Sequence, residues 1–171
     1  LYYYGTDIST GKIVASLLAY PGGKHDTEYV MPDFVTSTDC IITNEYLETI
    51  VIGENCENIY EPAKCSFDTI KVSPKNKFFE ESDGLLFSYG AEELIWVSKS
   101  KSGKLVVPDG VKSMQLRVAE GNELKTEVVL PESMEIISEG AFSGCRALES
   151  VVMPEGLKEI GKYAFYDCSQ L

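Results

Sequence analysis

The C-terminal part of the chain repeats itself with a period of 23 residues. Pairs of identical residues separated by this interval are Pro131 and Pro154, Phe142 and Phe165, Cys145 and Cys168, and Leu148 and Leu171. Pro108 lies one period before Pro131, again between apolar positions. A unit of this size cannot enclose a core alone, so repeats of about 20 to 50 residues fold by stacking on their neighbours. The period therefore predicts a solenoid of similar coils.

Each unit of the repeat begins with a short strand. Apolar residues alternate at Val151 and Met153, and Pro154 then ends strand pairing because proline has no backbone N–H. The Ala-Phe pair at 164–165 favours a short helical or 3₁₀ turn with the phenylalanine in the core. Stacking at a strand spacing of about 4.8 Å should superpose equivalent positions of successive coils. The superposed pairs would be Val128 and Val151, Phe142 and Phe165, and Cys145 and Cys168.

The earlier chain repeats less regularly, over a longer interval. Offsets of 76 to 77 residues relate 17–20 to 94–97 and Pro32 to Pro108. We therefore expect a super-unit that occurs twice, and each copy should open with a hairpin. The first strands of the hairpins would be 1–4 and 85–87, and the turn signals are Thr10-Gly11 and Asp83-Gly84. Dividing the length by the period predicts about seven coils.

The regular repeats carry a family resemblance. Residues 124–171 follow the pattern L-x-x-V-x-[ML]-P-x-x-[LM]-x-x-I-[GS]-x-x-A-F-x-x-C-x-x-L, which resembles the BspA-like (Treponema-type) leucine-rich repeat. Residues 1–123 follow it in degenerate form, with Gly53 and Ser73 in place of the proline. The resemblance implies a single right-handed leucine-rich-repeat solenoid over 1–171. It would be a β-rich α/β fold of short strands, short helical or 3₁₀ turns and hairpin-like insertions.

The same resemblance implies a biological setting. BspA-like proteins resemble adhesins, so we expect an extracellular or cell-surface bacterial module that binds a protein or glycan on a host or neighbouring cell. The chain starts at Leu1 and stops at Leu171 within the repeat pattern. We therefore expect a fragment of a longer array, with signal and anchor segments outside it. A spacer stalk, or an accessory module of a larger carbohydrate-active surface protein, is the alternative.

The charge balance bears on the partners. The chain has 27 Asp and Glu against 15 Lys and Arg, a net charge of −12. Nonspecific nucleic-acid binding requires clustered basic residues that neutralise phosphates. The apolar runs are also far shorter than the ~20 residues that cross a bilayer. We expect neither nucleic-acid binding nor membrane insertion in this segment.

Residues with catalytic potential are few. His25, the only histidine, lies in a loop rich in Pro and Gly, and we interpret it as a solvated turn residue. Neighbouring residues on a strand point to opposite faces, so the pairs Glu80-Glu81 and Glu92-Glu93 should converge poorly as a glycosidase or calcium site. We predict no catalytic residue, no metal site and no cofactor, and hence no enzyme.

The five cysteines do not form a C-x-x-C motif. Cys145 and Cys168 share one repeat position inside the solenoid. We expect all five to be buried free thiols that act as small apolar side chains. A disulfide between Cys56 and Cys65 is the alternative. The cysteines are Cys40, Cys56, Cys65, Cys145 and Cys168.

The outward residue of each predicted strand is the candidate partner-binding position. These residues, five of them valine, are Val30, Val51, Lys71, Val106, Val129 and Val152. Valine suits any strand, so β-propensity alone is one explanation. The other is an apolar stripe for a partner. Its rim would be Glu28, Thr49, Thr69, Glu127 and Ser150. A further aromatic set forms either local core or a stacking surface: Trp96, Tyr2, Tyr3, Tyr4, Tyr20 and Tyr89.

Overall fold

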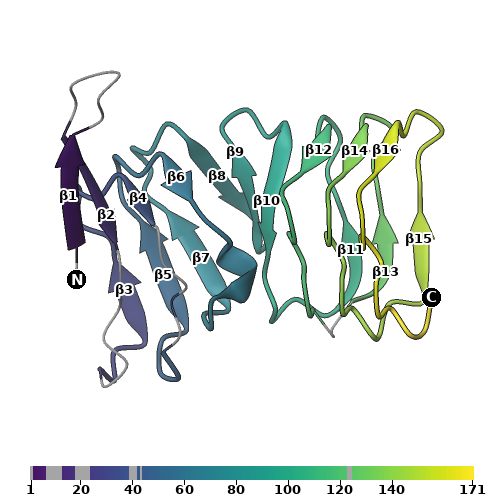
Figure 1. Cartoon of the computed structure of the whole chain (residues 1–171), viewed down its shortest axis with the longest axis horizontal. Coiled ribbons are helices and arrows are strands. Elements are labelled where there is room, and N and C mark those ends of the chain that lie inside the picture. Colours follow the sequence, from purple (N-terminus) through teal and green to yellow (C-terminus); the bar gives the residue numbers. More distant parts are fainter. Residues whose placement is uncertain (1, 7–12, 18–23, 39–41, 43, 123–124) are drawn as a thin grey trace. The chain divides into compact units, whose positions relative to one another are not determined.

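A computed structural model shows a chain of short strands joined by turns (Figure 1). It describes residues 2–6, 13–17, 24–38, 42, 44–122 and 125–171. The chain divides into two compact units, Leu1–Glu81 and Ser82–Leu171.

The first unit opens with an antiparallel hairpin of β1 (Tyr2–Thr6) and β2 (Ile13–Leu17). Strand β2 continues as a parallel sheet with β4 (Ser37–Thr38) and β6 (Asn58–Ile59). A second parallel sheet contains β3 (Glu28–Val30), β5 (Thr49–Ile52) and β7 (Thr69–Val72). A 3₁₀ turn, η1 (Pro62–Lys64), is the only helix among the described residues.

The second unit has the same plan. Its hairpin is β9 (Leu85–Ser88) and β10 (Glu93–Val97), and β10 runs parallel to β12 (Ser113–Met114). That sheet continues through β14 (Ile136–Ile137) and β16 (Glu159–Ile160). The other sheet contains β11 (Gly103–Val106), β13 (Lys125–Val129) and β15 (Ser150–Val152). Strand β8 (Phe79–Ser82) lies at the division between the units.

This repetition confirms the predicted super-unit and its opening hairpins. The Asp83-Gly84 turn is also confirmed, since both residues have left-handed φ angles of 52° and 73°. Thr10-Gly11 lies outside the described residues. Each three-stranded sheet takes one strand from every coil, which gives about six coils. The expected seven was too high because the hairpins use residues outside the regular coils.

The short helical or 3₁₀ turn expected at 164–165 is wrong, because neither kind of helix occurs at these residues. The backbone there makes successive tight turns, such as the hydrogen bond from Tyr166 N to Tyr163 O at 3.0 Å. Tyr163 and Asp167 have left-handed φ angles of 58° and 57°. An α-helix cannot pass through such residues, so the segment between them is limited to turns.

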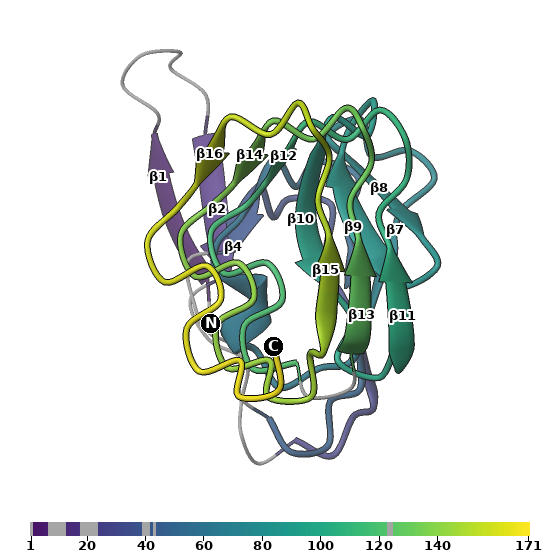
Figure 2. The ribbon, with the colours of Figure 1, turned by 90° about the vertical axis from the view of Figure 1, so that its right-hand side faces the viewer.

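The core of the second unit follows the repeat. Val128 pairs with Val151, and the rings of Phe142 and Phe165 stack with centroids 5.5 Å apart. The two cysteines of the repeat also make equivalent contacts, because the Cys145 thiol donates to Ala119 O and the Cys168 thiol to Phe142 O. The predicted superposition of these pairs is therefore confirmed. Figure 2 shows this unit along its coils, with β11, β13 and β15 on one side and β12, β14 and β16 on the other.

The described cysteines are free thiols, so a Cys56–Cys65 disulfide does not occur. Cys56, Cys65 and Cys145 are buried as expected, whereas Cys168 is only partly buried. Burial raises the pKa of Cys56 to about 12, which keeps this thiol protonated at neutral pH. Cys40 lies outside the described residues.

Candidate binding surface

The outward strand positions of the second unit form one row. Val106, Val129 and Val152 are register partners on β11, β13 and β15. Val106 is 53% exposed and Val152 is 50% exposed, and Val129 between them is partly exposed. Adjacent strands lie about 4.8 Å apart, so the three side chains are contiguous. We call these three residues the valine row.

A polar edge borders the valine row. Lys104, Glu127 and Ser150 are register partners two residues before the valines. Lys104 Nζ lies 3.1 Å from Glu127 Oε1. The apolar row therefore has charged and hydroxyl groups along one side, as protein-binding surfaces often do at their rim.

The corresponding row of the first unit is more polar. Val30, Val51 and Lys71 are register partners on β3, β5 and β7, and Val30 is 58% exposed. Lys71 Nζ lies 2.7 Å from Glu28 Oε2. Because Glu28 is on β3 and Lys71 on β7, this ion pair spans the middle strand β5. The structure thus places the six predicted residues in two rows of three, one in each unit.

The histidine and the aromatic residues singled out in the sequence lie in different surroundings. The ring of His25 stacks on Tyr46 with centroids 4.1 Å apart. Trp96 is 1% exposed and belongs to the core, whereas Tyr89 is 67% exposed. Tyr20 and the side chains of Tyr2, Tyr3 and Tyr4 lie outside what the structure describes.

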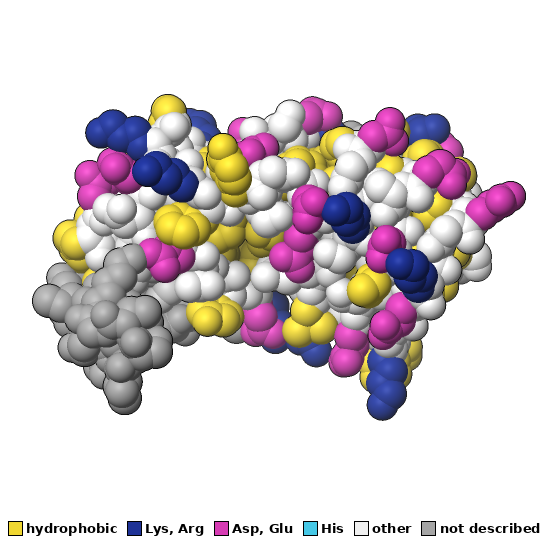
Figure 3. Space-filling model, turned by 90° about the horizontal axis from the view of Figure 1, so that it is seen from above, with side chains coloured by type: hydrophobic (Ala, Val, Ile, Leu, Met, Phe, Trp, Pro, Cys, Tyr) yellow, Lys and Arg dark blue, Asp and Glu magenta, His cyan; other side chains and the backbone are white. Residues whose placement is uncertain are grey.

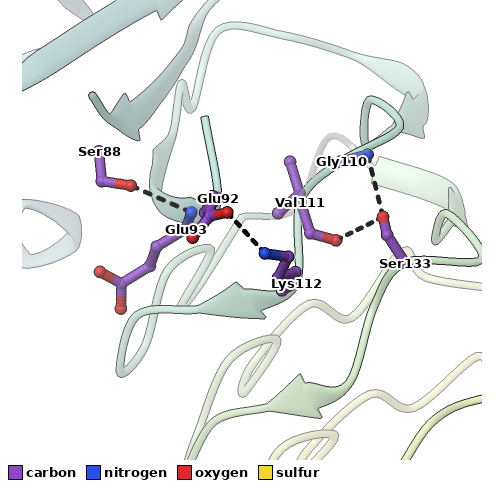
Figure 4. A network of polar contacts seen from close by, with 7 residues as sticks. All are labelled: Ser88, Glu92, Glu93, Gly110, Val111, Lys112 and Ser133. Carbon is purple, nitrogen blue, oxygen red and sulfur yellow. Dashed lines mark hydrogen bonds and ion pairs between the residues drawn. The ribbon is translucent and has the colours of Figure 1, made fainter. Parts of the chain in front are cut away.

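The Glu92-Glu93 pair diverges as predicted. In Figure 4 the Glu92 carboxylate points to Lys112, with Oε1 2.5 Å from Nζ, and the Glu93 carboxylate points away from it. The backbone N–H of Glu93 donates to Ser88 Oγ, and partial burial raises the pKa of its carboxyl. In the described ranges no three His, Cys, Asp or Glu side chains group to hold a metal ion. No helix in the same ranges is long and apolar enough to cross a membrane.

Sequence reasoning missed a ladder of alternating charges in the second unit. It consists of Glu92, Lys112, Glu135 and Lys158, which we call the charge ladder. Lys158 Nζ lies 2.8 Å from Glu135 Oε2, and Lys112 pairs with Glu92. Lys158 lowers the pKa of Glu135, and Glu92 raises the pKa of Lys112. The alternation of sign at spacings of 20, 23 and 23 residues is the signal that could have revealed it.

Surface charge is mixed in sign elsewhere too. Figure 3 shows acidic and basic side chains interspersed over one face of the described chain. In the charge ladder the charges are regularly arranged, because backbone hydrogen bonds connect the same residues in successive coils. The N–H of Glu135 donates to Lys112 O, and the N–H of Lys158 donates to Glu135 O.

Comparison with known proteins agrees with this geometry. Residues 98–171 match the family model of the BspA type leucine rich repeat region, in six copies. This part of the chain is a BspA-type leucine-rich repeat region. The resemblance noted at 124–171 is thus confirmed and begins earlier, at residue 98. Comparison with the curated proteins gives no significant match.

Solved structures show the fold. The pneumococcal vaccine antigen PcpA is 18% identical, with a TM-score of 0.69 over 84% of this chain and 49% of that chain. The leucine-rich repeat protein of Treponema pallidum is 14% identical, with a TM-score of 0.48 over 99% of this chain and 87% of that chain. The chain spans about half the length of PcpA. At these identities the similarity to PcpA establishes a leucine-rich-repeat solenoid.

Proposed function

We propose that the BspA-type repeat region is a non-catalytic binding module of a bacterial surface protein, and that the valine row contacts its partner. The observation that carries this proposal is the contiguous exposure of Val106, Val129 and Val152 on one sheet face. Solenoids use such extended faces for binding. Leucine-rich-repeat domains are generally non-catalytic and mediate protein interactions.

The geometry favours a partner over β-propensity alone. A strand residue chosen only for propensity could equally be threonine or tyrosine. Here the same branched apolar side chain occupies three adjacent strands, while Lys104, Glu127 and Ser150 occupy the next row. A docked protein would remove the exposed apolar surface from water, and the polar edge would fix its orientation.

The wider setting belongs to the same proposal. The partner would be a protein or glycan on a host or neighbouring cell. The repeat region would belong to a longer array of one solenoid type, held outside the cell by signal and anchor segments beyond residues 1–171. The family match at 98–171 and the solenoid fold support this setting.

Val129→Lys tests the valine row. After a panel of immobilised matrix proteins identifies a partner, the lysine should reduce affinity about tenfold or more, because a charge replaces the centre of the row. The melting temperature should change by no more than about 2 °C, since the side chain is partly solvated.

Ile136→Lys is the matched control. Ile136 is 37% exposed on β14, on the other side of the coil, so its replacement should leave affinity unchanged. Equal affinity of Val129→Lys and the unmodified chain would rule out the valine row. Failure of the full-length protein to bind any component of the panel would count against the binding function itself.

A further inference from the structure

The turns of the second unit enclose a surface groove of about 500 Å³. Six of its lining residues form two sets at 23-residue spacing. The first set is Arg117, Gly140 and Tyr163, and the second set is Glu120, Ser143 and Tyr166. We call this feature the turn groove. In Figure 2 the turns that follow β14 and β16 lie on the side of the coil away from β13 and β15.

The groove exists because the middle coil has small residues. Successive coils are joined by backbone hydrogen bonds, such as Gly140 N to Lys162 O at 2.9 Å and Phe142 N to Ala164 O at 2.8 Å. Equivalent side chains therefore lie one above another. At the middle level these are Gly140 and Ser143, with larger side chains in the coils on either side. An added Cβ at Gly140 would lie 3.1 Å from Arg117 Cγ, so the arginine stem packs over this glycine.

The three equivalent positions of the first set share one backbone conformation, although only one of them is a glycine. Arg117, Gly140 and Tyr163 all have left-handed φ angles, of 58°, 64° and 58°. Glycine adopts this conformation without strain, but arginine and tyrosine do so at an energetic cost. Residues held in such conformations concentrate at functional sites. The middle coil uses the unstrained residue, whereas the flanking coils retain a guanidinium and a phenol.

The two tyrosines present an aromatic corner to solvent. Their ring centroids are 5.9 Å apart, and the rings are nearly perpendicular at 82°. Tyr163 is 64% exposed and Tyr166 is 65% exposed. An aromatic face that remains in water offers a stacking surface for an apolar ring face.

Polar groups of both kinds surround this corner. Arg117 supplies donors, Glu120 and the neighbouring Glu139 supply acceptors, and the Ser143 hydroxyl can do either. Arg117 Nε lies 4.0 Å from Glu120 Oε2. Two carboxylates against one guanidinium give the groove a net negative charge, which disfavours an anionic ligand such as a phosphate or an acidic sugar. A neutral ligand with an apolar face and several hydroxyl groups fits this set.

We propose that the turn groove binds a neutral pyranose of a glycan, with one sugar face against Tyr163 or Tyr166. Its hydroxyl groups would hydrogen bond to Arg117, Glu120 and Glu139. The turn groove contains none of the residues of the valine row. It is therefore a second site, and its test is independent of the test of the function proposed above.

A glycan array probed with the full 171-residue chain tests this site. The probes are glycans that end in glucose, galactose, mannose or N-acetylglucosamine, beside sialylated and sulfated counterparts. We expect binding to at least one neutral glycan and weaker binding to its acidic counterpart. Tyr166→Ala should reduce that binding about tenfold or more, since it removes a stacking face.

Tyr163→Gly provides the sharper variant. Glycine relieves the left-handed strain, so the melting temperature should stay the same or rise while glycan binding is lost. Tyr89→Ala, which removes an equally exposed tyrosine of the same unit, and Val129→Lys should both retain glycan binding. The proposal is overturned by any of three results: no neutral glycan bound, preference for acidic glycans, or binding that survives both Tyr163→Gly and Tyr166→Ala.

Discussion

Single buried polar residues hold coils of the first unit together, and Asn76 is the best example. Its Nδ2 donates to Gly53 O at 2.7 Å and to Cys56 O at 3.0 Å. Its Oδ1 accepts from the backbone N–H groups of Phe78 and Phe79. One side chain thus satisfies backbone groups of two successive coils where water has little access.

Asn76→Ala should therefore destabilise the protein by about 2–4 kcal/mol, because several buried backbone groups lose their partners. Urea denaturation followed by circular dichroism measures this. Asn55→Ala is the control, since Asn55 is exposed and donates one hydrogen bond, to Asp33 O. It should cost less than about 1 kcal/mol. Similar losses in the two variants would show that Asn76 does not join the coils.

The role of Asn76 could not be predicted from the sequence. It lies in a polar loop, and the positions one period before and after it are Gly53 and Lys99, not asparagines. By contrast, the partners of Phe142 and Cys145 followed directly from the constant interval of 23. A regular period reveals which residues stack, whereas a hydrogen bond to a backbone carbonyl depends on the local course of the chain.

At the scale of the element, strands and turns differ in how well the pattern predicts them. The alternation at Val151 and Met153 correctly predicted a strand, and β15 occupies Ser150–Val152. The Ala-Phe pair suggested a helical turn because composition alone carries no information on the sign of φ at Tyr163 and Asp167. The turn groove could not be predicted either, because its shape depends on which coil has glycine at the left-handed position.

The charge ladder gives a prediction about neighbouring strands. Lys112→Glu would place three carboxylates in succession, at Glu92, 112 and Glu135. The melting temperature should fall at low salt, because like charges repel, and recover toward about 1 M salt, where the Debye length is about 3 Å. Lys112→Gln should cause a smaller fall. A decrease that is independent of salt would indicate lost packing instead of charge repulsion.

The pH dependence of the ladder provides a second check. Lys158 holds the pKa of Glu135 below its ordinary value of 4.5, so the unfolded chain binds this proton more tightly than the folded protein. The stabilisation is therefore complete above the ordinary pKa and is lost as the pH falls through the folded-state value. The difference in melting temperature between the unmodified chain and Glu135→Gln should be present at neutral pH and absent near about pH 2.

At the scale of the whole molecule, stability should depend on position among the coils. In a solenoid each coil contacts only its neighbours, so an inner coil supports two others. Phe142 is fully buried, whereas Phe165 in the next coil is partly exposed. The two phenylalanines occupy equivalent positions of the repeat, but they differ in how far they are buried in the 171-residue chain.

Phe142→Ala should cost about 3–5 kcal/mol in this chain, the usual value for a phenylalanine removed from a core. Phe165→Ala should cost clearly less, because its ring already meets solvent. Urea denaturation of both variants makes the comparison, with the slope m as the test of two-state unfolding. An equal loss of unfolding free energy in the two variants would mean that the position of a coil does not determine how much its phenylalanine contributes to stability.

The left-handed positions of the turns separate the path of the chain from the chemistry of its surface. Gly140 and Tyr163 direct the backbone in the same way although one has no side chain and the other a large one. The same holds for Gly144 and Asp167. These turns therefore keep the same backbone conformation with different side chains at equivalent positions. A combinatorial library at residues 117, 120, 140, 143, 163 and 166 could vary what this face recognises while the apolar interior stays untouched.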